Sequence, residues 1–209
     1  MAGALEAPVA TPATEANTMK MRNYITAAPT FHHKPIPTCK EANIGCDTRV
    51  LSALERSLEN ILEVTGFAHL LRYTVSLPGV SSTEGNKLFR QGQQEVVRLC
   101  QRRQLQPNYV AVKSKESKNQ YDVAMFLDGR TDTQKDRKIV ERADEIFKRK
   151  AELRGADAAQ CSVQRFDIPE TNILLYDKAD IDNAFLEGSR IAQVEYEPTG
   201  RTLFASPRK

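Results

Sequence analysis

Asp122 is the carboxylate of this chain that most needs a chemical explanation, because it lies between Tyr121 and Val123 at the start of an apolar run. A buried carboxylate is costly unless a hydrogen bond or an opposite charge compensates it, so we expect a partner for Asp122. It is either an acceptor for a neighbouring arginine or an oxygen ligand for a hard metal ion such as Mg²⁺. Gln120 offers only a neutral amide oxygen beside it, so the sequence predicts no metal site here.

If the protein is an enzyme, tyrosines are its candidate nucleophiles, and Tyr121 and Tyr176 are the two candidates. A tyrosine attacks only when a base, a metal or a lowered pKa activates it. Tyr121 leads an apolar run and no base adjoins it in sequence, which favours a packed strand aromatic. Tyr73, Tyr109 and Tyr176 have the same interpretation, and we assign no catalytic residue.

Basic residues gather in one part of the chain, with few acids between them. They are Arg98, Arg102, Arg103, Lys113, Lys115 and Lys118. We expect a hairpin turn at 113–119 to return beside the end of the preceding helix, which would place these side chains at one edge of the domain. Such a patch can neutralise the phosphates of single-stranded DNA or another nucleic acid, and Tyr109 can add a stacking surface. A solvated helix end and turn is the alternative.

Two histidines and two cysteines form the other group with metal-binding chemistry. His32, His33, Cys39 and Cys46 lie near one another, but zinc sites usually pair their ligands through shorter loops. We therefore expect neither a metal nor another cofactor. The four cysteines of the chain follow no disulfide framework, so a reduced state is expected.

Length and composition predict one cytoplasmic domain with a tail. The chain has 209 residues and a formal charge of +3, which is too mild to prove a nucleic-acid partner. No apolar run approaches membrane-spanning length, and the N-terminus lacks the pattern of a secretion signal. Residues 1–40 are rich in Ala, Thr, Pro and Glu without periodicity, which predicts a disordered leader before a single domain over 47–206.

The elements that position these residues follow from periodicity and turn signals. Apolar residues at helical spacing predict helices from Asp47 to Gly66, from Ser82 to Leu105, from Asp132 to Gly155, and more weakly over 180–193. Alternating or apolar runs bounded by turns predict strands over 70–77, 108–112, 121–127, 161–166, 173–176 and 202–205.

This order of elements indicates the α+β class, with a split β-α-β arrangement. We expect an antiparallel sheet of about four or five strands with helices packed on one face. The strand over 121–127 should be central and mostly buried, between 70–77 and 108–112, because its apolar content requires cover. Unrelated functions share such a fold, so the fold alone does not choose among them.

The hairpin resembles the core of filamentous-phage (inovirus) replication initiators and their prophage relatives, often called the YagK/YfjJ type, which are HUH endonucleases. There the second strand carries His-Tyr-His, an apolar run and Asn-Gly. Here the same place has Gln120-Tyr121-Asp122, the apolar run, and then Asp128-Gly129. The strand over 70–77 is similar to the family's first core strand, which also ends before a proline.

A second similarity lies in the last predicted helix. Relatives carry a Ser-Tyr-Leu-Ala-Lys type sequence with the nucleophilic tyrosine, and this chain has Ser189-Arg190-Ile191-Ala192-Gln193. The resemblance covers roughly residues 70–206. In the family the histidines hold a divalent metal and the tyrosine attacks the scissile phosphate. Gln120, Asp122 and Arg190 replace both halves of that mechanism, which implies a noncatalytic descendant.

The sequence thus predicts a catalytically degenerate relative of phage or plasmid replication initiators. It would bind DNA or act as a regulator in a prophage or other mobile element. One alternative is an active initiator that nicks single-stranded DNA through Tyr121 or Tyr176, with Asp122 as a Mg²⁺ ligand. Another is a protein-interaction module that binds a host or phage replication protein and no nucleic acid.

Overall fold

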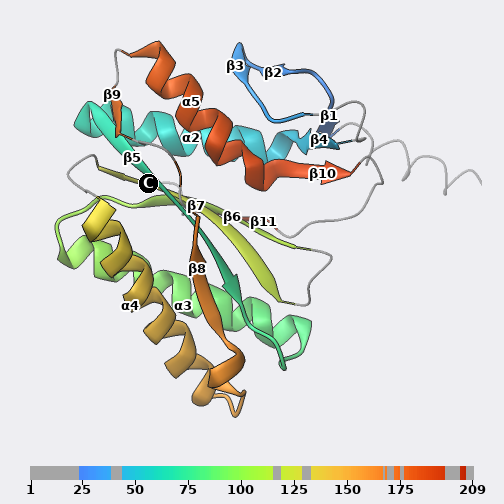
Figure 1. Ribbon diagram of the computed structural model, residues 1–209, viewed down its shortest axis with the longest axis vertical. Coiled ribbons are helices and arrows are strands. Elements are labelled where there is room, and N and C mark those ends of the chain that lie inside the picture. Colours follow the sequence, from blue (N-terminus) through green and yellow to red (C-terminus); the bar gives the residue numbers. More distant parts are fainter. Residues whose placement is uncertain are drawn as a thin grey trace, which may run out of the picture.

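The structure is a computed structural model, and it describes residues 24–38, 44–114, 119–128, 133–166, 168, 172–174, 177–195 and 203–205 (Figure 1). Within these residues the main feature is an antiparallel sheet that lies between two pairs of helices. The α+β class and the antiparallel sheet predicted from the sequence are confirmed.

The main sheet has six described strands in the order β11-β6-β7-β5-β8, with β9 also paired to β5. Their bounds are β5 Phe67–Ser76, β6 Asn108–Lys113, β7 Gln120–Asp128, β8 Ser162–Arg165, β9 Asn172–Leu174 and β11 Leu203–Ala205. Both β8 and β9 pair with the same edge of β5, at its two ends. The prediction that β7 lies between the first strand and its own hairpin partner is confirmed.

The strand β7 is buried because helices cover both of its faces. Tyr121, Val123, Met125 and Leu127 belong to the core under one pair of helices, and Ala124 and Phe126 belong to the core under the other pair. Successive side chains of a strand point to opposite faces, so a strand covered on both sides has a nearly continuous apolar run. The expectation that helices cover one face only is therefore wrong.

Helices α3 (Ser82–Arg102) and α4 (Thr133–Glu152) cover the first face. The side chain of Ser81 accepts a hydrogen bond from the backbone N–H of Glu84 and so caps α3. The two helices pack closely where Gly92 of α3 meets the ring of Phe147. The short 3₁₀ helix η1 (Ala158–Gln160) then leads into β8.

Helices α2 (Thr48–Thr65) and α5 (Lys178–Ser189) cover the second face (Figure 1). Asp47 caps α2, and Gly66 ends it in the left-handed conformation with a φ of 76°. The helix predicted over 180–193 begins and ends earlier, because Asp177 caps α5 and residues 190–192 form the 3₁₀ helix η2. Gln193–Glu195 then pair with another strand as β10.

Part of the expected leader belongs to the fold. Strand β4 (Ile44–Asp47) lies between β1 (Ile25–Thr26) and β10, and β2 (Thr30–Phe31) forms a hairpin with β3 (Lys34–Pro35). Ile36 is buried against α2 and α5, which gives these residues an apolar contact that their composition did not reveal. The prediction of a disordered leader over 1–40 is corrected for residues 24–38, and residues 1–23 lie outside the described residues.

The helices in the described part of the chain contain no stretch with the length and apolar character needed to cross a membrane.

Candidate nucleic-acid interface

Asp122 has the partner that its position required. The hydroxyl of Thr74, directly opposite on β5, donates a hydrogen bond of 2.6 Å to Oδ1 of Asp122. The half-buried carboxylate also lies close enough to Arg72 to help keep that guanidinium charged, although burial has the largest effect and lowers the pKa of Arg72. The expected compensation is confirmed, with a threonine as the hydrogen-bond donor.

Arg190 lies in the same neighbourhood. Its Nε and Nη2 donate to the two carboxylate oxygens of Glu187, each at 2.9 Å, and Nη1 of Arg72 is 3.5 Å from Oε2 of that carboxylate. The positive charge of Arg190 opposes that of Arg72. We call Arg72, Thr74, Asp122, Glu187 and Arg190 the Arg72 cluster.

The Arg72 cluster lies where the resemblance would place a catalytic centre. Gln120 points to the same face of β7 as Asp122, because it is two residues away on the strand. Arg190, which the resemblance would align with the family's tyrosine, is held by Glu187. No group of three His, Cys, Asp or Glu side chains among the described residues is arranged to hold a metal ion.

Tyr121 is enclosed by protein. Its ring is fully buried and stacks on Phe89 with a centroid separation of 4.2 Å, and its hydroxyl donates to Oδ1 of Asn86 at 2.8 Å. Burial raises the pKa of the Tyr121 hydroxyl far above its ordinary value, so the phenol stays protonated. This arrangement is that of a packed aromatic. Tyr176 lies outside the described residues.

Lys113 holds the hairpin to the start of α3. Its ammonium donates to Oγ of Ser82 and to Oδ1 of Asn119, both at 2.8 Å, and to Oδ1 of Asn86 at 3.3 Å. An ammonium has three donors, so these contacts use its capacity. Burial lowers the pKa of Lys113. This lysine is better suited to a structural role than to a phosphate contact.

The basic residues expected at one edge lie at opposite ends of α3. Lys113 contacts the first turn of this helix, whereas Arg102 and Arg103 are at its last turn, about 30 Å away along the axis. The reason is that β6 starts after α3 ends and runs back along it. The expectation of one compact patch is therefore wrong. Lys115 and Lys118 lie outside the described residues.

A longer basic surface replaces that patch. We define the α3 outer face as Lys87, Arg90, Gln91, Gln94, Arg98, Gln101 and Arg102. These residues recur every three or four positions, so they share one side of the helix, and all except the half-buried Gln91 are exposed. Sequence reasoning found Arg98 and Arg102 but missed Lys87 and Arg90, although the same helical period contains them.

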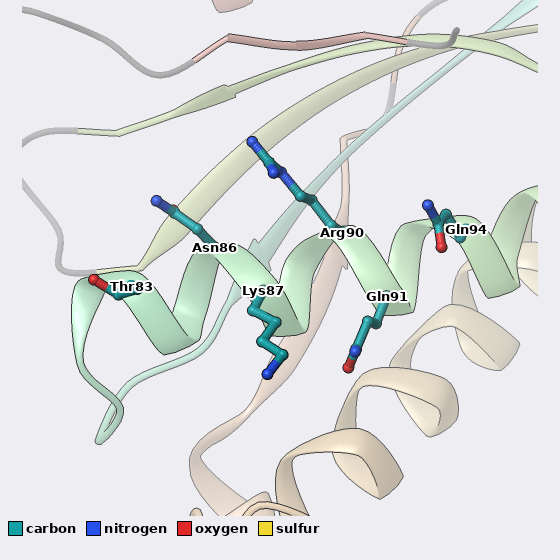
Figure 2. A pocket seen from close by; sticks show the side chains of 6 residues that line it. All are labelled: Thr83, Asn86, Lys87, Arg90, Gln91 and Gln94. Atoms are coloured by element: carbon teal, nitrogen blue, oxygen red, sulfur yellow. The ribbon is translucent and has the colours of Figure 1, made fainter.

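The α3 outer face includes a surface depression. It has a volume of about 470 Å³ and is lined by Thr83, Asn86, Lys87, Arg90, Gln91 and Gln94. Figure 2 shows Asn86 and Arg90 projecting to one side of the helix and Lys87 and Gln91 to the other. Arg90 also lies near Tyr109, where its charge opposes the burial that raises the pKa of this phenol.

The carboxylates of α3 lie at the edge of this face next to α4, because Glu84 is three positions from Lys87 and Glu95 is three positions from Arg98. Glu84 pairs with Arg154 of α4, and Glu95 pairs with Arg149 and Lys150 of the same helix. Among the described residues, no carboxylate forms an ion pair with Lys87, Arg98, Arg102 or Arg103. The two carboxylates of α3 are thus neutralised by cations of α4.

The basic residues of α4 are largely paired. Arg142 contacts Glu145, and Lys148 contacts Asp144, in addition to the α4 residues that neutralise the carboxylates of α3. The structure therefore distinguishes two basic helices that look alike in sequence. On α3 both carboxylates are paired with α4, and Lys87, Arg98 and Arg102 form no ion pair with a carboxylate among the described residues.

The histidines and cysteines weighed as zinc ligands, together with Tyr109, are the remaining residues considered from the sequence. His32 and His33 occupy the two-residue turn of the β2–β3 hairpin with positive φ values, and His32 is hydrogen-bonded to Glu55 at 2.8 Å. Cys46 is buried, and Cys39 lies outside the described residues. Tyr109 is only 8% exposed, so it offers no stacking surface and that expectation is corrected.

Comparison of the chain with protein-family models, curated proteins and solved structures finds no match.

Proposed function

We propose that this protein is a noncatalytic nucleic-acid-binding relative of HUH-type replication initiators, acting in the cytoplasm as an accessory or regulator of a prophage or other mobile element. The observation that carries nucleic-acid binding is the α3 outer face, where four exposed cations lie along one side of a helix whose two carboxylates are paired with α4. Cations arranged in this way neutralise phosphates and release counterions.

The Arg72 cluster supports a noncatalytic role. A nicking reaction of the family's kind needs metal ligands and an activated tyrosine. In this chain Asp122 accepts from Thr74, and the guanidinium of Arg190 is bound by Glu187. These residues form a network of ion pairs and hydrogen bonds. The lineage itself rests on the resemblance of the hairpin and the last helix.

Salt dependence tests nucleic-acid binding. We expect fluorescence anisotropy with labelled oligonucleotides to show an affinity that falls with salt. The slope should decrease by about 0.7 per lost phosphate contact for single strands and about 0.9 for duplex DNA. The double variant Arg98→Ala, Arg102→Ala should flatten the slope and weaken binding, because both side chains are exposed and have no carboxylate partner among the described residues.

A matched control removes two cations that already have partners. The double variant Arg142→Ala, Lys148→Ala takes the same charge from α4, where Glu145 and Asp144 are paired with these residues. It should change the slope less than the α3 variant does. Equal effects would show a response to net charge alone, and no salt-dependent binding at all would favour the protein-interaction module.

Incubation with single-stranded DNA in Mg²⁺ or Mn²⁺ tests the absence of nicking. We expect no covalent protein–DNA adduct on a denaturing gel, because Tyr121 is buried and protonated and Arg190 stands in the nucleophile's place. An adduct that disappears in Tyr121→Phe or Tyr176→Phe would establish the enzyme alternative in place of this one.

A further inference from the structure

We propose that the α3 outer face binds double-stranded DNA along a groove, with its cations on the phosphates and its glutamines toward the base edges. This inference rests on the proposed nucleic-acid binding and specifies its ligand. It depends on the length of the face, on the chemistry of its side chains, and on where the exposed aromatic residues lie.

The α3 outer face is long and continuous. From Lys87 to Arg102 it extends about 22 Å, since an α-helix rises about 1.5 Å per residue. The opposite side of the helix is buried against the sheet through Phe89, Val96 and Cys100. The major groove of DNA is about 12 Å wide and admits one α-helix, so a groove fits this shape better than a compact site does.

Cations stand on both flanks of the face. Figure 2 shows Arg90 on one side of α3 and Lys87 on the other. A groove has a phosphate backbone along each of its two edges, so cations on both flanks can contact both strands. A single strand presents only one row of phosphates and would leave one flank unused.

Glutamines occupy the space between the cations. Gln94 and Gln101 are exposed, and Gln91 is half-buried. A carboxamide has two donors and two acceptor positions, and glutamine can pair with N6 and N7 of adenine in the major groove. A solvated helix face is usually stabilised by pairs of glutamate and lysine one turn apart, whereas the two glutamates of α3 pair with arginine and lysine side chains of α4.

Aromatic residues are absent from the α3 outer face. Proteins that bind single strands without sequence preference stack bases on exposed aromatic side chains. The exposed aromatic residues among those described are Tyr24, Phe67 and Phe166, all on other elements. The ring of Phe166 lies 4.8 Å from the guanidinium of Arg72, which pairs with α5 across the sheet from α3. The α3 outer face therefore lacks what a single strand would need.

Anisotropy with a 20-base-pair duplex and its isolated strand, each over a salt series, tests the inference. We expect tighter binding to the duplex and some preference within a panel of duplex sequences. The double variant Gln91→Ala, Gln94→Ala should reduce that preference at least several-fold while keeping the salt slope, because it removes base-edge contacts and no charge. Gln164→Ala, an exposed glutamine on β8, is the matched control and should change neither.

The outcomes separate the two proposals. If neither oligonucleotide binds, the proposed function fails. The single strand could instead bind more tightly than the duplex, with an affinity that Phe166→Ala reduces and the α3 variants do not. In that case this inference is wrong and nucleic-acid binding stands. If the duplex binds tighter but all sequences bind alike, the glutamines do not read base edges. Equal melting temperatures confirm that each variant is folded.

Discussion

Glu55 shows how one carboxylate organises the N-terminal hairpin. It accepts hydrogen bonds from Lys34 and from His32, and its side chain is only 12% exposed. Burial alone would raise the pKa of Glu55, but the two hydrogen bonds and the nearby positive charge outweigh it and lower this pKa. The hairpin and α2 are thus joined by a carboxylate that the fold keeps ionised.

Glu55→Gln should lower the free energy of unfolding at neutral pH by about 1–2 kcal/mol, because a charge-assisted hydrogen bond is lost. A lowered carboxylate pKa stabilises the fold above the ordinary value of 4.5, and this stabilisation is lost as pH falls through the folded value. The difference between parent and variant, measured by urea unfolding from pH 7 to pH 3, should therefore shrink toward pH 3. A difference that grows on acidification would contradict this account.

At the scale of single residues, the sequence can predict that a buried polar group requires a hydrogen-bond partner, but it does not predict which residue is that partner. The apolar surroundings of Asp122 predict that something must hold it. That the donor is Thr74 follows only from the pairing register of β5 with β7, which local sequence does not determine. Lys113 illustrates the same limit. Its charge suggests a phosphate contact, while the fold surrounds its ammonium with oxygens of Ser82, Asn86 and Asn119.

At the scale of elements, the contact between α3 and α4 depends on a residue with no side chain. A Cβ added at Gly92 would lie 2.3 Å from Cε1 of Phe147. Phe147 is itself buried and packs on Phe89 with a centroid separation of 6.0 Å. The close approach of the two helices also brings Glu95 to Arg149 and Lys150, so this packing neutralises a carboxylate that borders the α3 outer face.

Gly92→Ala should destabilise the protein, although alanine is the better helix former by about 1 kcal/mol. The clash with Phe147 requires the helices to move apart, and overpacking of this kind costs about 1–3 kcal/mol. Thermal unfolding measures the effect, and Gly188→Ala is a control because an added Cβ there lies 3.5 Å or more from its neighbours. A Gly92→Ala variant more stable than its parent would show that this contact is loose.

Elements with strong periodicity could be predicted, and those defined by distant pairing could not. The stripes of α2 and α3 and the apolar run of β7 are local signals, and the structure confirms them. Strands β1, β2 and β3 have two residues each, too few to show an alternation, and they are stabilised by β4, α2 and α5. The α3 outer face is intermediate, because its helical period is local but the pairing of the carboxylates beside it depends on α4.

At the scale of the whole molecule, the central strands link the two cores. Met125 and Phe126 are neighbours on β7, yet Met125 packs under α3 and α4 whereas Phe126 packs under α2 and α5. Neither helix pair can lose its core without exposing one face of the same strands. The expected arrangement, with helices on one face only, would have no such coupling. Cooperative unfolding of the two cores therefore depends on the second pair of helices.

Met125→Ala and Phe126→Ala should therefore unfold the described domain as one unit. The losses should be about 2–5 kcal/mol for Met125→Ala and about 3–5 kcal/mol for Phe126→Ala, the usual costs of truncating buried side chains. Hydrogen exchange at low denaturant reports each helix separately, and in each variant the most protected amides of α2 and of α3 should lose the same free energy. If Met125→Ala lowered protection in α3 and left α2 unchanged, the two layers would be independent, and the α3 outer face would belong to a separately unfolding unit.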